Sequence, residues 1–287
     1  MNDISVQAMR RLSAAGGVEM PAMDLSKPLS EPEKQLVRDA FLEHHILVFR
    51  NQQLSKEAQA AFTEQFGELE DHVVRQHDGS KTPQVHTVSN LDADGKPSYK
   101  PLTHGNYFWH TDKSYHAKPS LATLLHAIEL PTEGGHTQFA NTGLAYESLP
   151  EERKQAFADL KVVHSWEANR RNTKNKPATE EEKRERPPVT HPLIRTHPET
   201  GKKVLYVGIH TSHVVGKSME ESRELLDELA DFCAQDEFVY SHEWQPGDLV
   251  MWDNTSIMHS RTPMPADQKR YLKRTGFYLP DDLAVPF

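Results

Sequence analysis

Two histidines and one aspartate in this chain have the types and spacing of a metal site. His110 and Asp112 stand two residues apart in Trp109-His110-Thr111-Asp112, and His259 follows far along the chain. Residues i and i+2 of a β-strand point to the same side, so a strand here would let both side chains bind one ion. Two histidines and one carboxylate are the ligands of many non-haem Fe(II) oxygenases, which keep other coordination positions open for chemistry. We therefore expect His110, Asp112 and His259 to be catalytic metal ligands.

Other functions fit the same three residues. Zn(II) hydrolases also use histidine and carboxylate ligands, and a β-rich module could hold a metal without catalysis. The chain contains 17 histidines, so a single histidine is a weak signal. Spacing alone therefore leaves an Fe(II) oxygenase, a Zn(II) hydrolase and a non-catalytic metal-binding module open.

The elements that must position these residues are mostly short strands. Capping-box patterns and apolar residues at helical spacing predict helices at 30–45 and 218–236, and a further helix is expected at 55–67. Apolar and β-branched runs predict strands at 46–50, 121–128, 193–196, 204–207, 238–242, 248–252 and 271–279. This order of elements is typical of an antiparallel β barrel or sandwich with flanking helices.

Residues 167–188 interrupt this pattern with a polar stretch that has almost no apolar content. We interpret it as a surface excursion or a flap over the active site, and a plain solvated insertion fits equally well. We expect residues 1–287 to form a single domain around it.

Composition excludes several classes of function. The chain has 287 residues, a net charge of −9 and no long basic run, which argues against nucleic acid as a partner. No apolar run approaches the ~20 residues of a membrane span. The single Cys233 and the absence of a recognisable secretory signal predict a cytoplasmic protein. The sequence leaves a monomer and a homo-oligomer both open.

Four groups of residues together resemble the TauD/TfdA family, the taurine dioxygenase and phenoxyacetate-herbicide dioxygenase family. They are Trp109-His110-Thr111-Asp112; Gly134-Gly135-His136-Thr137; Gly247-Asp248 with Trp252-Asp253-Asn254 and His259; and Arg270 with Arg274. The resemblance runs from about Ile46 to Phe277. It implies a mainly β fold with flanking helices around a double-stranded β-helix (jelly roll), and an Fe(II)- and 2-oxoglutarate-dependent dioxygenase that consumes O2.

The resemblance also implies roles for individual residues. His110, Asp112 and His259 would hold the iron, while Thr137 and Arg270 would bind a 2-oxoglutarate carboxylate. The substrate would contact Arg274, Asn106 and Arg75. The planar guanidinium of Arg270 suits a carboxylate, and its charge would balance the dianionic cosubstrate.

The resemblance further implies a small anionic substrate. Residues 236–254 look closer to the phenoxyacetate branch of the family than to the taurine branch. We therefore expect an aryloxyalkanoate-type carboxylate, hydroxylated beside its ether oxygen so that a phenol is released, with succinate and CO2 as co-products. A taurine-like alkylsulfonate is the alternative.

Overall fold

The structure is a computed structural model that describes residues 9–70, 84–92, 94–98 and 106–281. The strands are β1 Arg10–Ser13, β2 Gly16–Glu19, β3 Ile46–Phe49, β4 His86–Ser89, β5 Ser120–Glu129, β6 Thr137–Asn141, β7 Lys161–His164, β8 Val189–Pro192, β9 Ile194–Thr196, β10 Lys203–Leu205, β11 Thr211–Val214, β12 Val239–His242, β13 Leu249–Asp253, β14 Ile257–Arg261 and β15 Tyr271–Tyr278. The helices are α1 Glu31–His44, α2 Lys56–Glu64, α3 Thr142–Ser148, α4 Glu151–Phe157, α5 Trp166–Asn172, α6 Glu180–Glu185 and α7 Met219–Cys233, with a short 3-10 turn at Asp236–Phe238.

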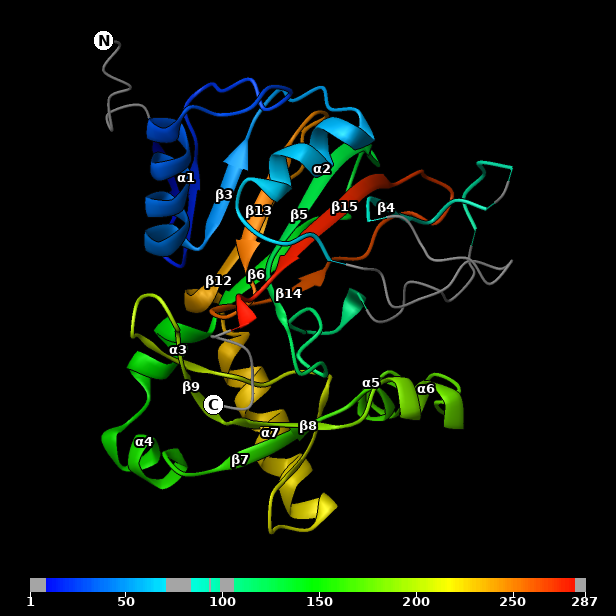
Figure 1. The fold of residues 1–287 in the computed structure, drawn as a ribbon. Coiled ribbons are helices and arrows are strands. Elements are labelled where there is room, and N and C mark those ends of the chain that lie inside the picture. The colour runs from blue at the N-terminus through cyan, green and yellow to red at the C-terminus, as the bar shows by residue number, and fades with distance from the viewer. Residues whose placement is uncertain (1–8, 71–83, 93, 99–105, 282–287) are drawn as a thin grey trace.

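A seven-stranded sheet forms one half of the molecule (Figure 1). Its strands lie in the order β1-β2-β3-β13-β5-β15-β4, and every neighbouring pair is antiparallel except β2 and β3. The apolar residues of its central strands alternate between the two faces, as the two-residue period of a strand requires. Leu47 and Met251 pack on one side, whereas Val48 and Val250 pack on the other.

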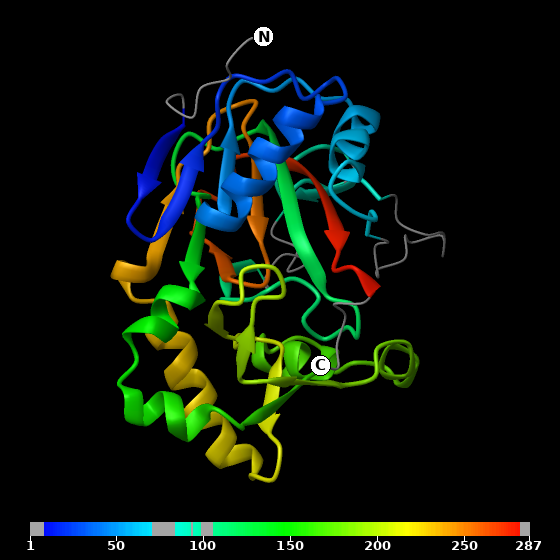
Figure 2. The same ribbon diagram turned by 60° about the vertical axis from the view of Figure 1, so that its left-hand side comes forward.

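Helices α1 and α2 cover the first face of this sheet. Val37 and Phe41 of α1 and Phe62 of α2 share a core cluster with Leu47 and Met251. Figure 2 shows α1 lying across β3. Each helix begins at a predicted serine cap: the Ser30 hydroxyl and Glu33 complete a capping box, and Ser55 accepts from the N–H of Ala58.

A three-stranded sheet in the order β12-β6-β14 faces the second side of the large sheet. Phe139 of β6 and Ile257 of β14 pack against Val48, Val250 and Trp252 of the large sheet. Their neighbours along the chain, Ala140 and Met258, belong to another core cluster on the outer side. The inner faces of the two sheets therefore pack against each other.

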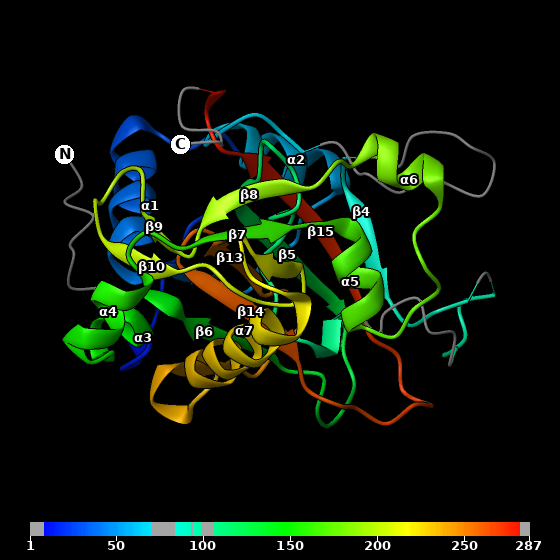
Figure 3. The same cartoon turned by 90° about the horizontal axis from the view of Figure 1, so that it is seen from below.

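The outer cluster is closed by α3, α4, α7 and the small strands. Leu226 and Leu229 of α7 pack with Ala140 and Met258, and Figure 3 shows α7 lying beside β6 and β14. The remaining strands pair as β11-β7-β8 and as the hairpin β9-β10. The capping box of α7 joins Ser218 and Glu221, as the sequence predicts.

The structure corrects one sequence prediction. Asp112 does not lie on a strand, because only His110 pairs with a strand and a turn follows directly. Residues 167–188 contain most of α5 and all of α6, and Ala168 and Ala178 are buried. That the segment is a surface excursion or a flap stays a prediction.

Among the described residues, no helix combines the length and apolar character that crossing a bilayer requires.

Candidate active site

His110 and His259 are held side by side by their own backbones. An isolated antiparallel bridge pairs them, with N–H to carbonyl distances of 3.1 and 2.8 Å. Directly opposed residues of an antiparallel pair project to the same side. The two imidazole centroids accordingly lie 4.1 Å apart, and both side chains are nearly buried.

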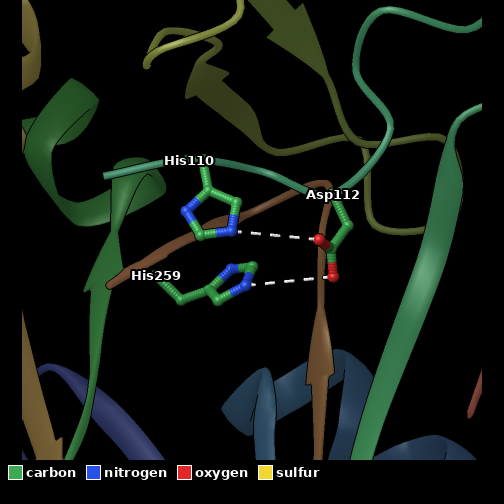
Figure 4. Close-up of side chains that lie close together, drawn as sticks. All are labelled: His110, Asp112 and His259. Carbon is green, nitrogen blue, oxygen red and sulfur yellow. Dashed lines mark ion pairs between the residues drawn. The ribbon is translucent and has the colours of Figure 1, made fainter. Parts of the chain in front are cut away.

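Asp112 completes the group from the turn that follows His110 (Figure 4). Its Oδ1 lies 4.0 Å from His110 Nε2, and its Oδ2 lies 3.8 Å from His259 Nε2. The candidate ligand atoms of the three residues all lie within 4.8 Å of one another. The turn thus achieves what the predicted strand would have achieved, but by bending the chain toward His259.

The histidine ring nitrogens fit a metal ligand set. His110 Nδ1 lies 2.7 Å from the carbonyl oxygen of Phe108, so its Nδ1–H donates there and Nε2 keeps a lone pair. Burial, followed by the neighbouring His110, lowers the pKa of His259 well below its ordinary value, so this imidazole is neutral. Two neutral imidazoles and one carboxylate facing one point are the donors that divalent iron takes.

Three side chains hold the Asp112 carboxylate in place. Thr123 donates its hydroxyl to Asp112 Oδ2 at 2.6 Å, and Arg274 donates Nη2–H to the same oxygen at 2.9 Å. Asn254 donates to the Thr123 hydroxyl at 2.9 Å. Burial would raise the pKa of Asp112, but Arg274, the two histidines and Thr123 together lower it well below its usual range. Asp112 is therefore ionised.

Glu70 and Lys113 form a further charged layer behind Arg274. Glu70 Oε2 accepts from Arg274 Nη1 at 3.1 Å and lies 3.1 Å from Lys113 Nζ. The side chains of Glu70 and Lys113 are buried. Burial opposes the charge of Arg274, but Asp112 and Glu70 raise its pKa above the ordinary value. Arg274 thus stays charged between two carboxylates.

Thr137 and Arg270 meet at another part of the same cavity. Arg270 donates Nη2–H to the Thr137 hydroxyl at 3.4 Å and Nε–H to the carbonyl of Gly135 at 3.0 Å. The Thr137 hydroxyl also accepts from the indole N–H of Trp244 at 3.0 Å. Arg270 is 2% exposed, and among the described residues the structure records no ion pair for it. Burial, then the charge of Arg261, lowers the pKa of Arg270 to about 9.

A buried guanidinium without an acidic partner needs an anion. Arg270 therefore fits the carboxylate of a bound 2-oxoglutarate, just as the three ligand atoms near Asp112 fit a divalent metal.

The cavity collects most of the residues that the sequence singled out. Seven of them line it: Asn106, His110, Asp112, Thr137, His259, Arg270 and Arg274. Arg75 lies outside the described residues, so its predicted substrate contact stays a prediction. Trp252 also lines the cavity, and its ring centroid lies 4.7 Å from that of His259.

Sequence reasoning missed several polar residues of the site. Thr123 and Glu70 act through contacts between distant segments, and no local pattern marks them. Asn254 belongs to a motif that the sequence singled out, but no role was expected for it. Arg261 also lines the cavity. It stands two residues after His259 on β14, so the two-residue period of a strand could have identified it.

Comparison with a family model gives a match over most of the chain. The model described as "Taurine catabolism dioxygenase TauD, TfdA family" matches residues 9–275. The chain is also similar to the alpha-ketoglutarate-dependent 2,4-dichlorophenoxyacetate dioxygenase of Cupriavidus pinatubonensis. The two are 34% identical over 268 residues, which cover 91% of this chain and 93% of the relative.

Two solved structures are similar in fold. The crystal structure of AAD-2 in complex with Mn(II) and N-oxalylglycine matches with a TM-score of 0.85 and 36% identity, over 94% of this chain and 98% of AAD-2. The crystal structure of a taurine dioxygenase from Burkholderia xenovorans matches with a TM-score of 0.76 and 31% identity, over 97% of this chain and 94% of the other.

Proposed function

Because the chain belongs to the taurine catabolism dioxygenase TauD, TfdA family, we propose that it hydroxylates an aryloxyalkanoate-type carboxylate. It is a 2-oxoglutarate-dependent dioxygenase that uses Fe(II) and O2. The 34% identity to a 2,4-dichlorophenoxyacetate dioxygenase over nearly the whole of both chains supports this substrate class. Hydroxylation beside the ether oxygen gives a hemiacetal, which breaks into a phenol and an oxo acid.

The observation that carries the reaction class is the pairing of two features in one cavity. One is the group of His110, Asp112 and His259, and the other is the buried Arg270 beside Thr137. When bound, iron and 2-oxoglutarate would activate O2, which is the oxidant: oxidative decarboxylation of the cosubstrate releases CO2 and places one oxygen atom in succinate, and the other oxygen atom reaches the substrate.

The residues of the chain would bind the metal, orient the cosubstrate and exclude water. His110, Asp112 and His259 would hold the metal from one side. Arg270 and Thr137 would orient the distal carboxylate of 2-oxoglutarate. Trp252 and Leu125 supply apolar wall to the cavity and help to exclude water.

Arg274 would contribute to both metal binding and substrate binding. Its bonds to Asp112, Glu70 and Thr123 do not exhaust the N–H donors of a guanidinium. We propose that its remaining donors bind the substrate carboxylate, with Asn106 at the same cavity and Arg75 as a further candidate contact. The substrate anion would then lie next to the group that orients Asp112.

The two facing sheets also support a more specific fold. We propose that the two facing sheets are the halves of a double-stranded β-helix, and that residues 1–287 form one domain. The antiparallel pairing of β13 with β5 and of β14 with β6 supports this arrangement.

An alkylsulfonate such as taurine is the second candidate substrate. The 31% identity to a solved taurine dioxygenase favours it, and a guanidinium binds sulfonate as well as carboxylate. A non-catalytic metal module is disfavoured because Arg270 and Thr137 are both present in the cavity.

The deciding experiment screens aryloxyalkanoates and alkylsulfonates for substrate-stimulated succinate formation by the Fe(II)-loaded protein. We expect stimulation by aryloxyacetates or aryloxypropionates, with an equal amount of phenol released. Stimulation by sulfonates alone would show that the substrate is an alkylsulfonate and not an aryloxyalkanoate. The ferrous protein with 2-oxoglutarate under anaerobic conditions should also show a weak visible charge-transfer band, and its absence at full iron loading would contradict the reaction class.

A further inference from the structure

Arg261 is a buried cation of the cavity that the proposed function has not yet used. It is 7% exposed and lines the same cavity as Arg270 and the metal-binding group. Among the described residues, the structure records no ion pair for it, and its Nε has no hydrogen-bond partner. An unpaired guanidinium at this depth is costly unless an anion accompanies it.

The strand register places Arg261 at the Thr137 end of the cavity. On β14 it stands two residues after His259, so both side chains leave the strand on one side. Its directly paired residue on β6 is Thr137, and side chains of such pairs lie on the same face. The Thr137 hydroxyl in turn accepts from Arg270. Arg261 and Arg270 therefore approach Thr137 from two different strands.

Electrostatics indicate that the two arginines act on each other. The charge of Arg261 is the largest cause after burial that lowers the pKa of Arg270. Two buried like charges repel each other, and an anion between them compensates both. By contrast, Arg274, the third arginine of the cavity, already has Asp112 and Glu70.

A stacked aromatic ring holds Arg261 in this place. Its guanidinium carbon lies 4.4 Å from the centroid of Tyr107, which is 38% exposed. Stacking on a tyrosine face leaves the N–H donors at the edge of the guanidinium directed sideways. Tyr107 is thus the more exposed member of this pair.

We propose that Arg261 is a second guanidinium for the distal carboxylate of 2-oxoglutarate, so that this carboxylate binds between Arg261 and Arg270. This inference rests on the proposed function. It makes Arg261 a residue that determines cosubstrate specificity: a 2-oxo acid with an uncharged tail leaves two buried cations uncompensated and is rejected strongly.

The test compares two cosubstrates that differ by one carboxylate. Binding of 2-oxoglutarate and of 2-oxobutyrate, which lacks the distal carboxylate, is measured by calorimetry on the Mn(II)-loaded protein without oxygen. Arg261→Gln should weaken 2-oxoglutarate binding by about tenfold or more, as expected for a lost charge-assisted hydrogen bond. Its affinity for 2-oxobutyrate should equal or exceed the native value, because one fewer buried cation then faces the uncharged tail.

Further variants guard against a folding defect. Arg261→Lys keeps the charge but loses the planar fork, so its affinity for 2-oxoglutarate should lie between those of the native protein and Arg261→Gln. Arg270→Gln sets the scale for loss of the other guanidinium. Arg153→Gln, which removes an arginine that pairs with Glu228 at the surface, is the matched control and should bind both acids normally.

The other outcomes overturn the inference. Equal weakening of both acids by Arg261→Gln would give Arg261 a structural role. Unchanged 2-oxoglutarate binding with weaker aryloxyacetate binding would make it a substrate residue. If the native Mn(II)-loaded protein did not bind 2-oxoglutarate at all, the proposed function itself would be wrong. That result differs from the outcomes above, in which only the role of Arg261 is wrong.

Discussion

At the scale of single residues, the two carboxylate oxygens of Asp112 have different sets of partners. Asp112 Oδ2 accepts from Thr123 and Arg274 and faces His259, whereas Oδ1 faces His110. One oxygen is thus tied to the protein while the other is the less engaged of the two. This division lets the carboxylate bind a metal without losing its orientation.

Asp112→Ala should abolish turnover while the fold survives. The change removes a metal ligand and leaves Arg274 paired with Glu70, so the buried arginine keeps one counter-charge. Succinate formation with saturating Fe(II) measures the activity, and thermal melting of the metal-free protein measures stability. Asp39→Ala, at an exposed carboxylate on α1, is the control. Substantial activity in Asp112→Ala would exclude Asp112 as a ligand.

Glu70→Gln tests the charged layer behind the metal ligands. Glu70 is the shared acceptor of Arg274 and Lys113, so its neutralisation leaves the buried Lys113 and the partly buried Arg274 with less compensation. We expect a loss of about 3 kcal/mol in the free energy of unfolding. Arg274 would then pair more strongly with Asp112, which makes the Asp112 carboxylate a weaker metal ligand. The affinity for the metal should therefore fall about tenfold or more.

Glu68→Gln provides the matched control for this prediction, because Glu68 is an exposed acid paired with Lys118. Denaturant titration and metal titration are run on both variants. Identical behaviour of the two variants would mean that Glu70 has no part in supporting the site.

At the scale of elements, the polar segment 167–188 is joined to the turn that carries Asp112. Trp166, which begins α5, packs at 5.2 Å from the ring of Tyr115, three residues after Asp112. Glu182 of α6 accepts from the Trp166 indole at 3.3 Å and pairs with Arg170. Its other carboxylate oxygen accepts the N–H of Thr179 in a capping box. One glutamate therefore connects both helices.

Glu182→Gln should loosen this pair of helices locally. The variant loses an ion pair that is partly exposed, so we expect about 1 kcal/mol, or roughly fivefold faster amide exchange across α5 and α6. Hydrogen-exchange mass spectrometry measures the change. The neighbouring Glu181→Gln, at an exposed position of the same helix, should leave exchange unaltered. Equal exchange in the two variants would show that Glu182 does not join the helices.

Sequence alone predicted elements well where one local signal decides them. The capping boxes at Ser30 and Ser218 and the apolar strands near 46–50 and 248–252 are confirmed within a residue or two. It was wrong where a tertiary contact decides. The bridge to His259 fixes His110, and the chain then turns, so Asp112 is not on a strand. Composition gave no sign of the two helices in segment 167–188, which Glu182 connects through Trp166 and Arg170.

The candidate site shows the same division. The order and gaps of His110, Asp112, Thr137, His259 and Arg270 carried enough information to place them in one cavity. Thr123 and Glu70 were beyond reach, because their roles follow from which strand lies next to β15. Arg274 pairs in register with Leu125 of β5, and that pairing brings Thr123 within 3.1 Å of its guanidinium.

At the scale of the whole molecule, a buried histidine cluster joins the segment after Asp112 to strands β7 and β8. The Ser114 hydroxyl lies 3.0 Å from His164 Nδ1 and 3.1 Å from His210 Nδ1, and the Ser114 carbonyl accepts from His191 Nε2 at 2.7 Å. Burial is the largest cause that lowers the pKa of His191 to about 4 and of His210 to about 3, and it lowers that of His164 as well. All three are neutral in the folded protein.

These histidines should make the protein sensitive to mild acid. The unfolded chain takes up protons near the ordinary histidine pKa of 6.5, whereas the folded chain rejects them, so stability rises with pH. The stability that these neutral histidines permit is fully present above about pH 6.5, and it falls as the pH drops toward 4. A pKa lowered from 6.5 to about 4 costs about 3 kcal/mol at the acid end. His191 and His210 together therefore cost an appreciable part of the total stability of a typical domain, about 5–15 kcal/mol.

Urea unfolding between pH 7.5 and about 4.5, on chelator-treated protein so that metal release adds nothing, measures this dependence. His191→Gln keeps a donor for the Ser114 carbonyl but cannot titrate. It should lower the number of protons taken up on unfolding near pH 5 by about one, whatever it does to stability at pH 7. The count separates proton rejection from packing, because a mere packing defect lowers stability equally at every pH. A variant with the native pH slope would mean that His191 titrates normally in the fold and that burial of this cluster does not set the acid limit.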